Sequence, residues 1–235
     1  MTAQKILLFD IDGTLIHAVR RPEYRSLINE MLKEIFGTCG RISEVDFGGR
    51  TDLSIYREAL ECEGITIDEI RQQLPLVEAQ MVNILHGLAE TGIVYKLGAG
   101  VRELLDTLSM DNQFLPSLLT GNVEKLAEAK LRHVDIWHYF KGRGAYGSDA
   151  EDRDHLPAIA AARVREHLGT ELHPEQFVVI GDTPRDISCA KFFGAKVLAI
   201  ATGRHTVEEL QEYKPDAILP DFSNITAVYH LLKQL

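Results

Sequence analysis

The chain has 235 residues, of which 45% are hydrophobic and 26% charged, a balance typical of a soluble globular protein that can bury a large core. Its net charge of −10 argues against a general affinity for nucleic acid or anionic membranes, because the overall field repels polyanions. No apolar run could span a bilayer, and no signal-peptide pattern opens the chain. The three widely spaced cysteines fit a reducing compartment, so we expect a cytoplasmic protein. We also expect a monomer or small homo-oligomer.

The first predicted element is a buried strand. The apolar run 6–9 ends in Asp10, and Asp12 follows before Gly13 and Thr14. Such a run, stopped by acid and glycine, is typical of a parallel strand that delivers its last residue to the carboxyl edge of a sheet, where open α/β sheets bind ligands. Two carboxylates this close are either metal ligands or an acid/base pair, and a solvated turn is the alternative.

The next segment is helical. Apolar spacing predicts helices over 22–36, from Thr51 or Asp52 to about 63, and over 68–86, where Pro75 is expected to kink or divide the helix. No convincing strand lies between residue 16 and about residue 92. We therefore predict an all-helical cap domain, residues 17–91, inserted directly after the first strand.

Strands and helices then alternate. Further strands are predicted at 114–119, 145–146, 177–180, 196–201 and 217–219, and helices at 99–108, 123–132, 155–168, from Thr183 or Pro184 onward, and at 224–235. This alternation indicates a parallel, doubly wound sheet with right-handed crossovers. The predicted fold class is α/β, with a Rossmann-like core formed by residues 1–16 and 92–235.

Three of these strands end in polar residues that chemistry could use. These are Asp10 and Asp12 after the first, Thr120, Gly121 and Asn122 after the second, and Gly181, Asp182 and Asp186 after the fourth. Asp182 and Asp186 are four residues apart, so a helix starting at Pro184 lets both face one crevice. Four carboxylates around one point require a hard cation, and oxygen ligands without His or Cys favour Mg²⁺. Helix capping is the alternative for Asp182 and Asp186.

These segments resemble a known family. Residues 10–15, 118–122 and 181–186 are similar, in order and spacing, to motifs one, two and four of the haloacid dehalogenase-like hydrolases. The helical insertion resembles the first cap type of that family, as in phosphoglycolate phosphatases. The resemblance covers nearly the whole chain and implies a Mg²⁺-dependent phosphatase that acts on a small phosphorylated metabolite.

The resemblance also implies a role for each motif residue. Asp10 is the expected nucleophile, forming an aspartyl-phosphate. Asp12 would protonate the leaving alcohol and then activate water, while its main-chain carbonyl joins the Mg²⁺ shell. Thr120, with the amides of Gly121 and Asn122, would hold a phosphoryl oxygen. Asp182, with Asp186 in support, would complete a metal site that includes Asp10 and Asp12.

Two basic residues are candidates for the rest of the site. The family usually places a lysine before the helix that precedes motif four, and here Arg153 occupies that place. Arginine neutralises the same charge with a bulkier fork, although a surface salt bridge is the alternative, and Lys141 is the reserve candidate. In the cap, Arg50 follows a glycine pair and could bind a substrate carboxylate or second phosphate, the alternative being a solvated arginine.

Other functions remain possible on this scaffold. A phosphomutase of the β-phosphoglucomutase kind would use the same Asp10 and Asp12. A dehalogenase is disfavoured because Asp12 has no task when the leaving group is halide. A non-catalytic phosphate-binding module of receiver type is the runner-up from another class, and the second acid and the inserted cap argue against it.

Overall fold

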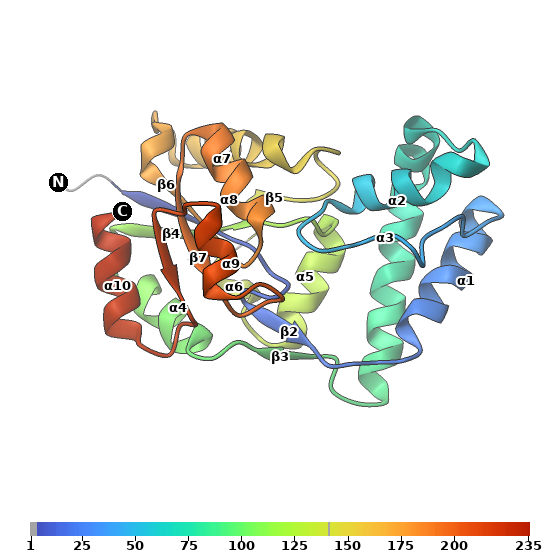
Figure 1. Ribbon diagram of the computed structural model, residues 1–235, viewed down its shortest axis with the longest axis horizontal. Coiled ribbons are helices and arrows are strands. Elements are labelled where there is room, and N and C mark those ends of the chain that lie inside the picture. Colours follow the sequence, from blue (N-terminus) through green and yellow to red (C-terminus); the bar gives the residue numbers. More distant parts are fainter. Residues whose placement is uncertain (1–3, 141) are drawn as a thin grey trace.

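A six-stranded parallel sheet forms the centre of the molecule (Figure 1). The computed structural model describes residues 4–140 and 142–235, so the reserve candidate Lys141 lies outside the described residues. The strands follow the order β5-β4-β1-β6-β7-β8, and every pair is parallel. Their bounds are Lys5–Phe9 for β1, Phe114–Leu119 for β4, Gly144–Ala145 for β5, Phe177–Gly181 for β6, Lys196–Ile200 for β7 and Ala217–Leu219 for β8.

Helices cover both faces of this sheet. The bounds are Val101–Ser109 for α4, Glu124–His133 for α5, Trp137–Phe140 for α6, Leu156–Leu168 for α7, Pro184–Phe193 for α8, Val207–Glu212 for α9 and Ile225–Gln234 for α10. Side chains alternate along β1, so that Leu7 and Phe9 pack with α4, α5 and α10. Ile6 and Leu8 pack with α7, α8 and α9 on the other face. The predicted doubly wound α/β fold is confirmed.

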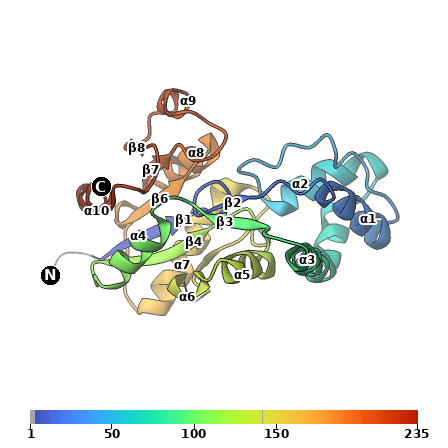
Figure 2. The same cartoon turned by 90° about the horizontal axis from the view of Figure 1, so that it is seen from below.

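Three helices lie beyond one end of the sheet (Figures 1 and 2). They are α1, Tyr24–Phe36; α2, Asp52–Leu60; and α3, Ile67–Glu90. One of them, α3, is next to α5. Thr66 starts α3 with a capping box that also uses Glu69. Over the described ranges 4–140 and 142–235, neither the 24-residue α3 nor any other helix is apolar over enough length to cross a membrane.

Pro75 does not divide α3, so the expected division of this helix is wrong, and the alternative expectation of a kink stays a prediction. A proline inside a helix removes one hydrogen bond and costs about 3 kcal/mol or more. Here buried Leu74 and Val77 flank the proline, and Ile70 and Met81 bury the same face one turn further out. The packing of this face holds the helix continuous through Pro75.

A two-stranded antiparallel sheet lies where the chain leaves the large sheet toward α1–α3 and where it returns from them. Its strands are β2, Ile16–Ala18, and β3, Tyr95–Leu97, with Ile16 paired to Leu97. The expectation of no strand from residue 16 to about residue 92 is therefore wrong at β2, because three residues are too few to show a period-two pattern. The division of the chain into core and cap stays a prediction.

Three short 3₁₀ helices complete the described elements. They are η1, Glu61–Glu63; η2, Arg153–His155; and η3, Pro174–Gln176. The first ends the region predicted as the tail of α2. The second starts at Arg153, a candidate site residue, and leads directly into α7. The position of Arg153 therefore depends on how α7 packs.

Candidate active site

The carboxyl ends of β4, β1 and β6 lie next to one another. Phe9, the last residue of β1, pairs with Leu118 on one side and Ile180 on the other. The residues that follow these strand ends therefore meet at one edge of the sheet, as the sequence predicts.

Three carboxylates converge at this edge. Asp10, Asp182 and Asp186 each offer an oxygen within 4.8 Å of the others, and no side chain of the three is exposed by more than a few per cent. Asp12 is different, because 43% of its side chain is exposed and its Oδ2 faces Asn122 and Lys130. The predicted four-acid cluster thus separates into three buried carboxylates and one that faces a cavity.

Arg153 lies inside this cluster. Its Nη2 donates to Asp10 Oδ1 at 3.0 Å and to Asp186 Oδ1 at 2.6 Å, and its side chain is 5% exposed. The surface salt bridge considered as an alternative is therefore wrong. Arg153 opens η2, which Asp152 caps, so the guanidinium reaches the strand ends from the start of the α7 segment.

Asp186 serves two neighbours at once. Its Oδ2 accepts from the N–H and the hydroxyl of Thr183, at 3.0 and 2.7 Å, in a capping box that begins α8. Its Oδ1 is bonded to Arg153. The capping alternative is correct for Asp186 as local structure, and the same carboxylate fixes the position of Arg153.

Asp182 is less occupied. Its Oδ1 accepts from the hydroxyl of Thr14 at 3.0 Å. Gly13 has a φ of 91°, a left-handed conformation that favours glycine, and a Cβ there would lie 2.4 Å from Asp182 Oδ2. The turn after β1 can thus approach Asp182 only because residue 13 lacks a side chain.

Burial raises the pKa values of two of these acids, Asp10 and Asp182. The pKa of Asp10 rises from 3.8 to about 7. Burial is the largest cause, the Arg153 guanidinium opposes it, and the neighbouring carboxylates add to it. Burial, followed by Asp10 and Asp186, raises the pKa of Asp182 from 3.8 to about 8. One guanidinium therefore does not compensate three buried carboxylates.

This residual negative charge fits a bound divalent cation. The donors are all carboxylate oxygens, which hard cations prefer. Asp10 and Asp182 have the least occupied oxygens, whereas both oxygens of Asp186 already accept hydrogen bonds. The arrangement supports a cation held mainly by Asp10 and Asp182, with Asp186 behind Arg153.

The raised pKa values predict how metal-free protein responds to pH. In the unfolded chain Asp10 and Asp182 lose their protons near pH 3.8, whereas the folded protein keeps them to about pH 7 and 8. Their contribution to stability is full below pH 3.8 and is lost as pH rises through 8. With a chelator present, we expect Tm to fall by several degrees between pH 5 and 8.5, measured by scanning fluorimetry.

Asp182→Asn is the matched control, because it removes one titrating group without changing its size. The variant should show a smaller fall in Tm, and added Mg²⁺ should raise the wild-type Tm more at pH 8 than at pH 5. A wild-type Tm that changes with pH as the variant does would contradict the assigned pKa shifts.

The residues after β4 form a second part of the site. Thr120 is fully buried, and its Oγ1 accepts from the Asn122 side chain at 2.8 Å, which leaves the hydroxyl proton to donate. Asn122 also donates to Asp12 Oδ2 at 2.7 Å. Gly121 has no room for a side chain, because a Cβ would lie 1.8 Å from the Arg50 carbonyl oxygen.

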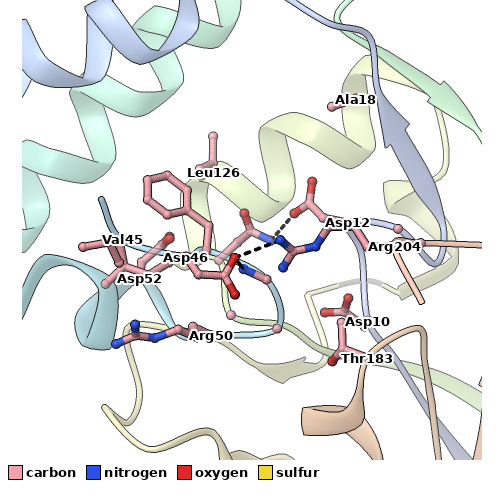
Figure 3. A pocket seen from close by; sticks show the side chains of 18 of the residues that line it. Asp10, Asp12, Ala18, Val45, Asp46, Arg50, Asp52, Leu126, Thr183 and Arg204 are labelled. Atoms are coloured by element: carbon pink, nitrogen blue, oxygen red, sulfur yellow. Dashed lines mark hydrogen bonds and ion pairs between the residues drawn. The ribbon is translucent and has the colours of Figure 1, made fainter. Parts of the chain in front are cut away.

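The side chain of Arg50 does not face the acids. Its guanidinium is bonded to Glu58 and to the main-chain oxygen of Ser54, both on α2. Figure 3 shows it pointing away from Asp10 and Asp12. The structure therefore does not support the expected contact between this side chain and a substrate, because Glu58 already neutralises its charge.

Residues 46–52, here called the 46–52 loop, contact the sheet edge on both sides. Asp52 N donates to Gly121 O at 2.7 Å, and Val123 N donates to the Asp52 carboxylate at 2.8 Å. On the other side Arg204 is bonded to Asp46 at 2.9 Å (Figure 3). The loop thus joins the segments that follow β4 and β7.

A cavity of about 730 Å³ opens above the acids. Its floor is formed by Asp10, Asp12 and Asp182, and its far wall by side chains of the inserted helices. This wall is apolar and aromatic, formed by Tyr24, Ile28, Ile55, Tyr56 and Met81. The cavity can hold a small organic molecule with one end at the carboxylates.

Sequence reasoning missed several polar residues of this site. They are Thr14, which donates to Asp182; Asp52, which binds the start of α5; Thr183, which pairs with Asp186; and Lys130, which lies on α5. Only Lys130 carried a signal, because it occupies the buried stripe of α5 together with Leu126 and Ala127. A lysine at a core-facing position indicates a buried acidic partner.

Individual relatives and solved structures match nearly the whole chain, and a family model matches part of it. A family model described as HAD-hydrolase-like matches residues 155–225. The Dickeya dadantii protein named Probable phosphatase IndB is 25% identical over 242 residues, covering 98% of this chain and 95% of that protein. The phosphoglycolate phosphatase of Pasteurella multocida is 24% identical, covering 97% and 99% respectively. The structure of a predicted phosphoglycolate phosphatase from Haemophilus somnus has a TM-score of 0.63 at 22% identity, covering 97% of this chain and 99% of that chain.

Proposed function

Because this chain belongs to the haloacid dehalogenase-like superfamily, we propose that it is a Mg²⁺-dependent phosphatase that hydrolyses a small phosphorylated metabolite through an aspartyl-phosphate at Asp10. The meeting of Asp10, Asp182 and Arg153 at adjacent strand ends carries this proposal. One phosphoryl group bound at this edge would be within reach of all three residues. Asp10 would be the nucleophile, Asp10 and Asp182 would be metal ligands, and Arg153 would be the cation that binds phosphate.

Asp10 is the proposed nucleophile. It ends β1, is 4% exposed, and lies on the floor of the cavity. Its Oδ1 is bonded to Arg153, which leaves the other carboxylate oxygen to attack phosphorus. The bond from this oxygen to phosphorus forms as the bond to the leaving alcohol breaks.

Asp12 is the proposed acid and base. It lies two residues beyond the nucleophile, and its partial exposure to the cavity gives access to a leaving group and to water. It gives a proton to the alcohol in the first step and takes one from the attacking water in the second.

Thr120 and Arg153 are the proposed ligands of the phosphoryl oxygens. Within the described part of the chain the Thr120 hydroxyl accepts from Asn122 and donates to no protein group, so its proton can bind a phosphoryl oxygen. The main-chain amides of Gly121 and Asn122 follow it in the chain. Arg153 lines the cavity, and its positive charge attracts both carboxylates and phosphate. The proposed metal ligands are the side chains of Asp10 and Asp182 and the main-chain carbonyl of Asp12, with Asp186 in support. When bound, Mg²⁺ supplies positive charge that lets an anionic carboxylate approach an anionic phosphate.

We further propose that residues 17–91 form a cap over a core of residues 1–16 and 92–235. The cavity supports this division, because the acids on its floor come from the core segments and its far wall comes from α1, α2 and α3. Phosphoglycolate, the substrate named for several relatives, is the first metabolite to assay. A cytoplasmic location also stays a prediction.

The direct test is hydrolysis of p-nitrophenyl phosphate with Mg²⁺ and with excess chelator. We expect turnover with Mg²⁺ and a loss of about 10²-fold or more in chelator, restored by added Mg²⁺. Activity that is indifferent to chelator would exclude the metal role. Binding of phosphate without turnover would instead indicate a non-catalytic module.

The phosphomutase alternative uses the same acids and needs its own measurement. Incubation with glucose 1-phosphate distinguishes the two reactions. A phosphatase releases inorganic phosphate, whereas a mutase yields glucose 6-phosphate without net release.

A further inference from the structure

Lys130 is a buried lysine whose charged end faces the proposed acid and base. It lies on α5 between the apolar Leu126 and Leu131, and the residue is 5% exposed. Its Nζ donates to Asp12 Oδ2 at 2.7 Å and to Asn122 Oδ1 at 2.6 Å. A buried ammonium is costly unless it is paired, and both partners belong to the site.

The surroundings keep Lys130 charged. Burial alone would lower its pKa, but the Asp12 carboxylate, followed by Tyr95 and Tyr24, raises the pKa above its ordinary value. The ammonium also lies 5.4 Å from the centre of the Tyr95 ring. The Lys130 ammonium is therefore a donor held in place by Asp12 and Asn122.

Asn122 connects Lys130 and Asp12 to Thr120, the proposed ligand of a phosphoryl oxygen. Its Nδ2 donates to Asp12 Oδ2 at 2.7 Å and to Thr120 Oγ1 at 2.8 Å, while its Oδ1 accepts from Lys130. One hydrogen-bonded chain thus links Lys130, Asn122 and Thr120 to Asp12. Lys130 contacts Asp12 directly and Thr120 only through Asn122, so loss of the lysine acts first on Asp12.

The two oxygens of Asp12 are not equivalent in this arrangement. Both donors, Lys130 Nζ and Asn122 Nδ2, bond to Oδ2. Among residues 4–140 and 142–235, no hydrogen bond reaches Asp12 Oδ1. Lys130 and Asn122 thus determine which oxygen is held and which is left for other partners.

We propose that Lys130 is a positioning residue for proton transfer, holding Asp12 by Oδ2 so that Oδ1 exchanges protons with the leaving oxygen and with water. This inference rests on the proposed function. In the first step Asp12 Oδ1 gives its proton to the leaving oxygen as the phosphorus–oxygen ester bond breaks. In the second, water attacks phosphorus, its proton moves to Oδ1, and the bond to Asp10 breaks to release phosphate.

Two esters of similar shape separate this role from a structural one. p-Nitrophenolate leaves readily without a proton, whereas the alkoxide of p-nitrobenzyl phosphate requires one. Lys130→Met should slow the first turnover of p-nitrobenzyl phosphate by about 10²-fold, the usual contribution of general acid catalysis. The first turnover of p-nitrophenyl phosphate, followed as a burst of product, should change by less than about 3-fold.

Lys125→Met is the matched control. Lys125 lies on the same helix, its side chain is 62% exposed, and it forms a loose ion pair with Glu78 at 3.9 Å. The control should leave both first turnovers unchanged. If Lys130→Met does not fold, as judged by thermal melting, Lys130→Gln takes its place, because it keeps a donor without the charge or the reach to Asp12.

The outcomes separate this inference from the proposed function. A Lys130 variant that slows both esters equally would show a structural role only, and one that matches wild type would show no role. Either result, with an active wild-type enzyme, overturns the positioning role and leaves the phosphatase intact. A wild-type protein that cleaves neither ester removes the proposed function and this inference with it.

Discussion

Asp10→Asn is expected to abolish turnover, lowering kcat by about 10⁴-fold or more, because a neutral amide cannot form the acyl-phosphate. The substitution keeps the size of the side chain and its acceptor oxygen toward Arg153. The measurement is steady-state hydrolysis of p-nitrophenyl phosphate, together with acid-quenched detection of phosphate bound to the protein. Wild type should show bound phosphate and the variant none.

The fold of Asp10→Asn should be intact. Burial raises the pKa of Asp10 to about 7, so its charge is unfavourable in the metal-free site. A neutral residue also removes repulsion from Asp182 and Asp186. The Tm of the variant in chelator at pH 8 should therefore equal or exceed that of wild type. Retained activity at any substantial level would remove Asp10 from the mechanism.

Arg153→Met is expected to weaken both the fold and the activity. It removes the partner of two buried carboxylates, Asp10 and Asp186, and breaking such a pair costs about 3–5 kcal/mol. The corresponding fall in Tm is about 10 °C for a chain of this size. Activity should fall by about 10²–10³-fold, the effect of removing one donor from a developing anion.

The pH dependence of this destabilisation is a sharper test. Without Arg153, the pKa of Asp10, which burial already raises, should rise further above that of the unfolded chain. The Asp10 carboxyl is then protonated in the folded protein at low pH, so the deficit in Tm should shrink from pH 8 to pH 5. A deficit that stays constant with pH would mean that lost packing, not lost charge, explains the change.

Arg153→Lys and Arg132→Met complete this comparison. Lysine keeps the charge but not the planar fork, so it should restore most of the stability and part of the activity. Arg132 forms an exposed pair with Glu128 on one helix, and such pairs contribute about 0–1 kcal/mol. Its loss should leave Tm and activity near those of wild type.

The main features of the site could be predicted because the strands that carry it are short, apolar and abruptly ended. Asp10, Thr120 and Asp182 each follow such a strand, and parallel strands bring their carboxyl ends to one edge whatever their order in the sheet. Arg153 was found only by resemblance, since nothing in its charged segment indicates that it is buried.

Contacts between residues distant in sequence were less predictable. Lys130 is 118 positions from Asp12, and no local pattern records that pairing. Asp186 could be predicted as either a cap or a cluster member, and only the coordinates show that its two oxygens do both. The contact between the Arg50 guanidinium and Glu58 was not predicted, because the sequence does not show which of several acids the side chain binds.

The close approach of the Arg50 carbonyl to Gly121 bears on which parts of the cavity can change. At that point the segment before α2 meets the segment after β4 through main chain, so this contact does not depend on which side chains the neighbouring helices carry. Ile28, Tyr56 and Met81 line the cavity with side chains that also pack in the core, so changes there are limited to residues of similar volume. If the proposed function is correct, a different alcohol would be accommodated by such changes, while the main-chain contact at Gly121 stays the same.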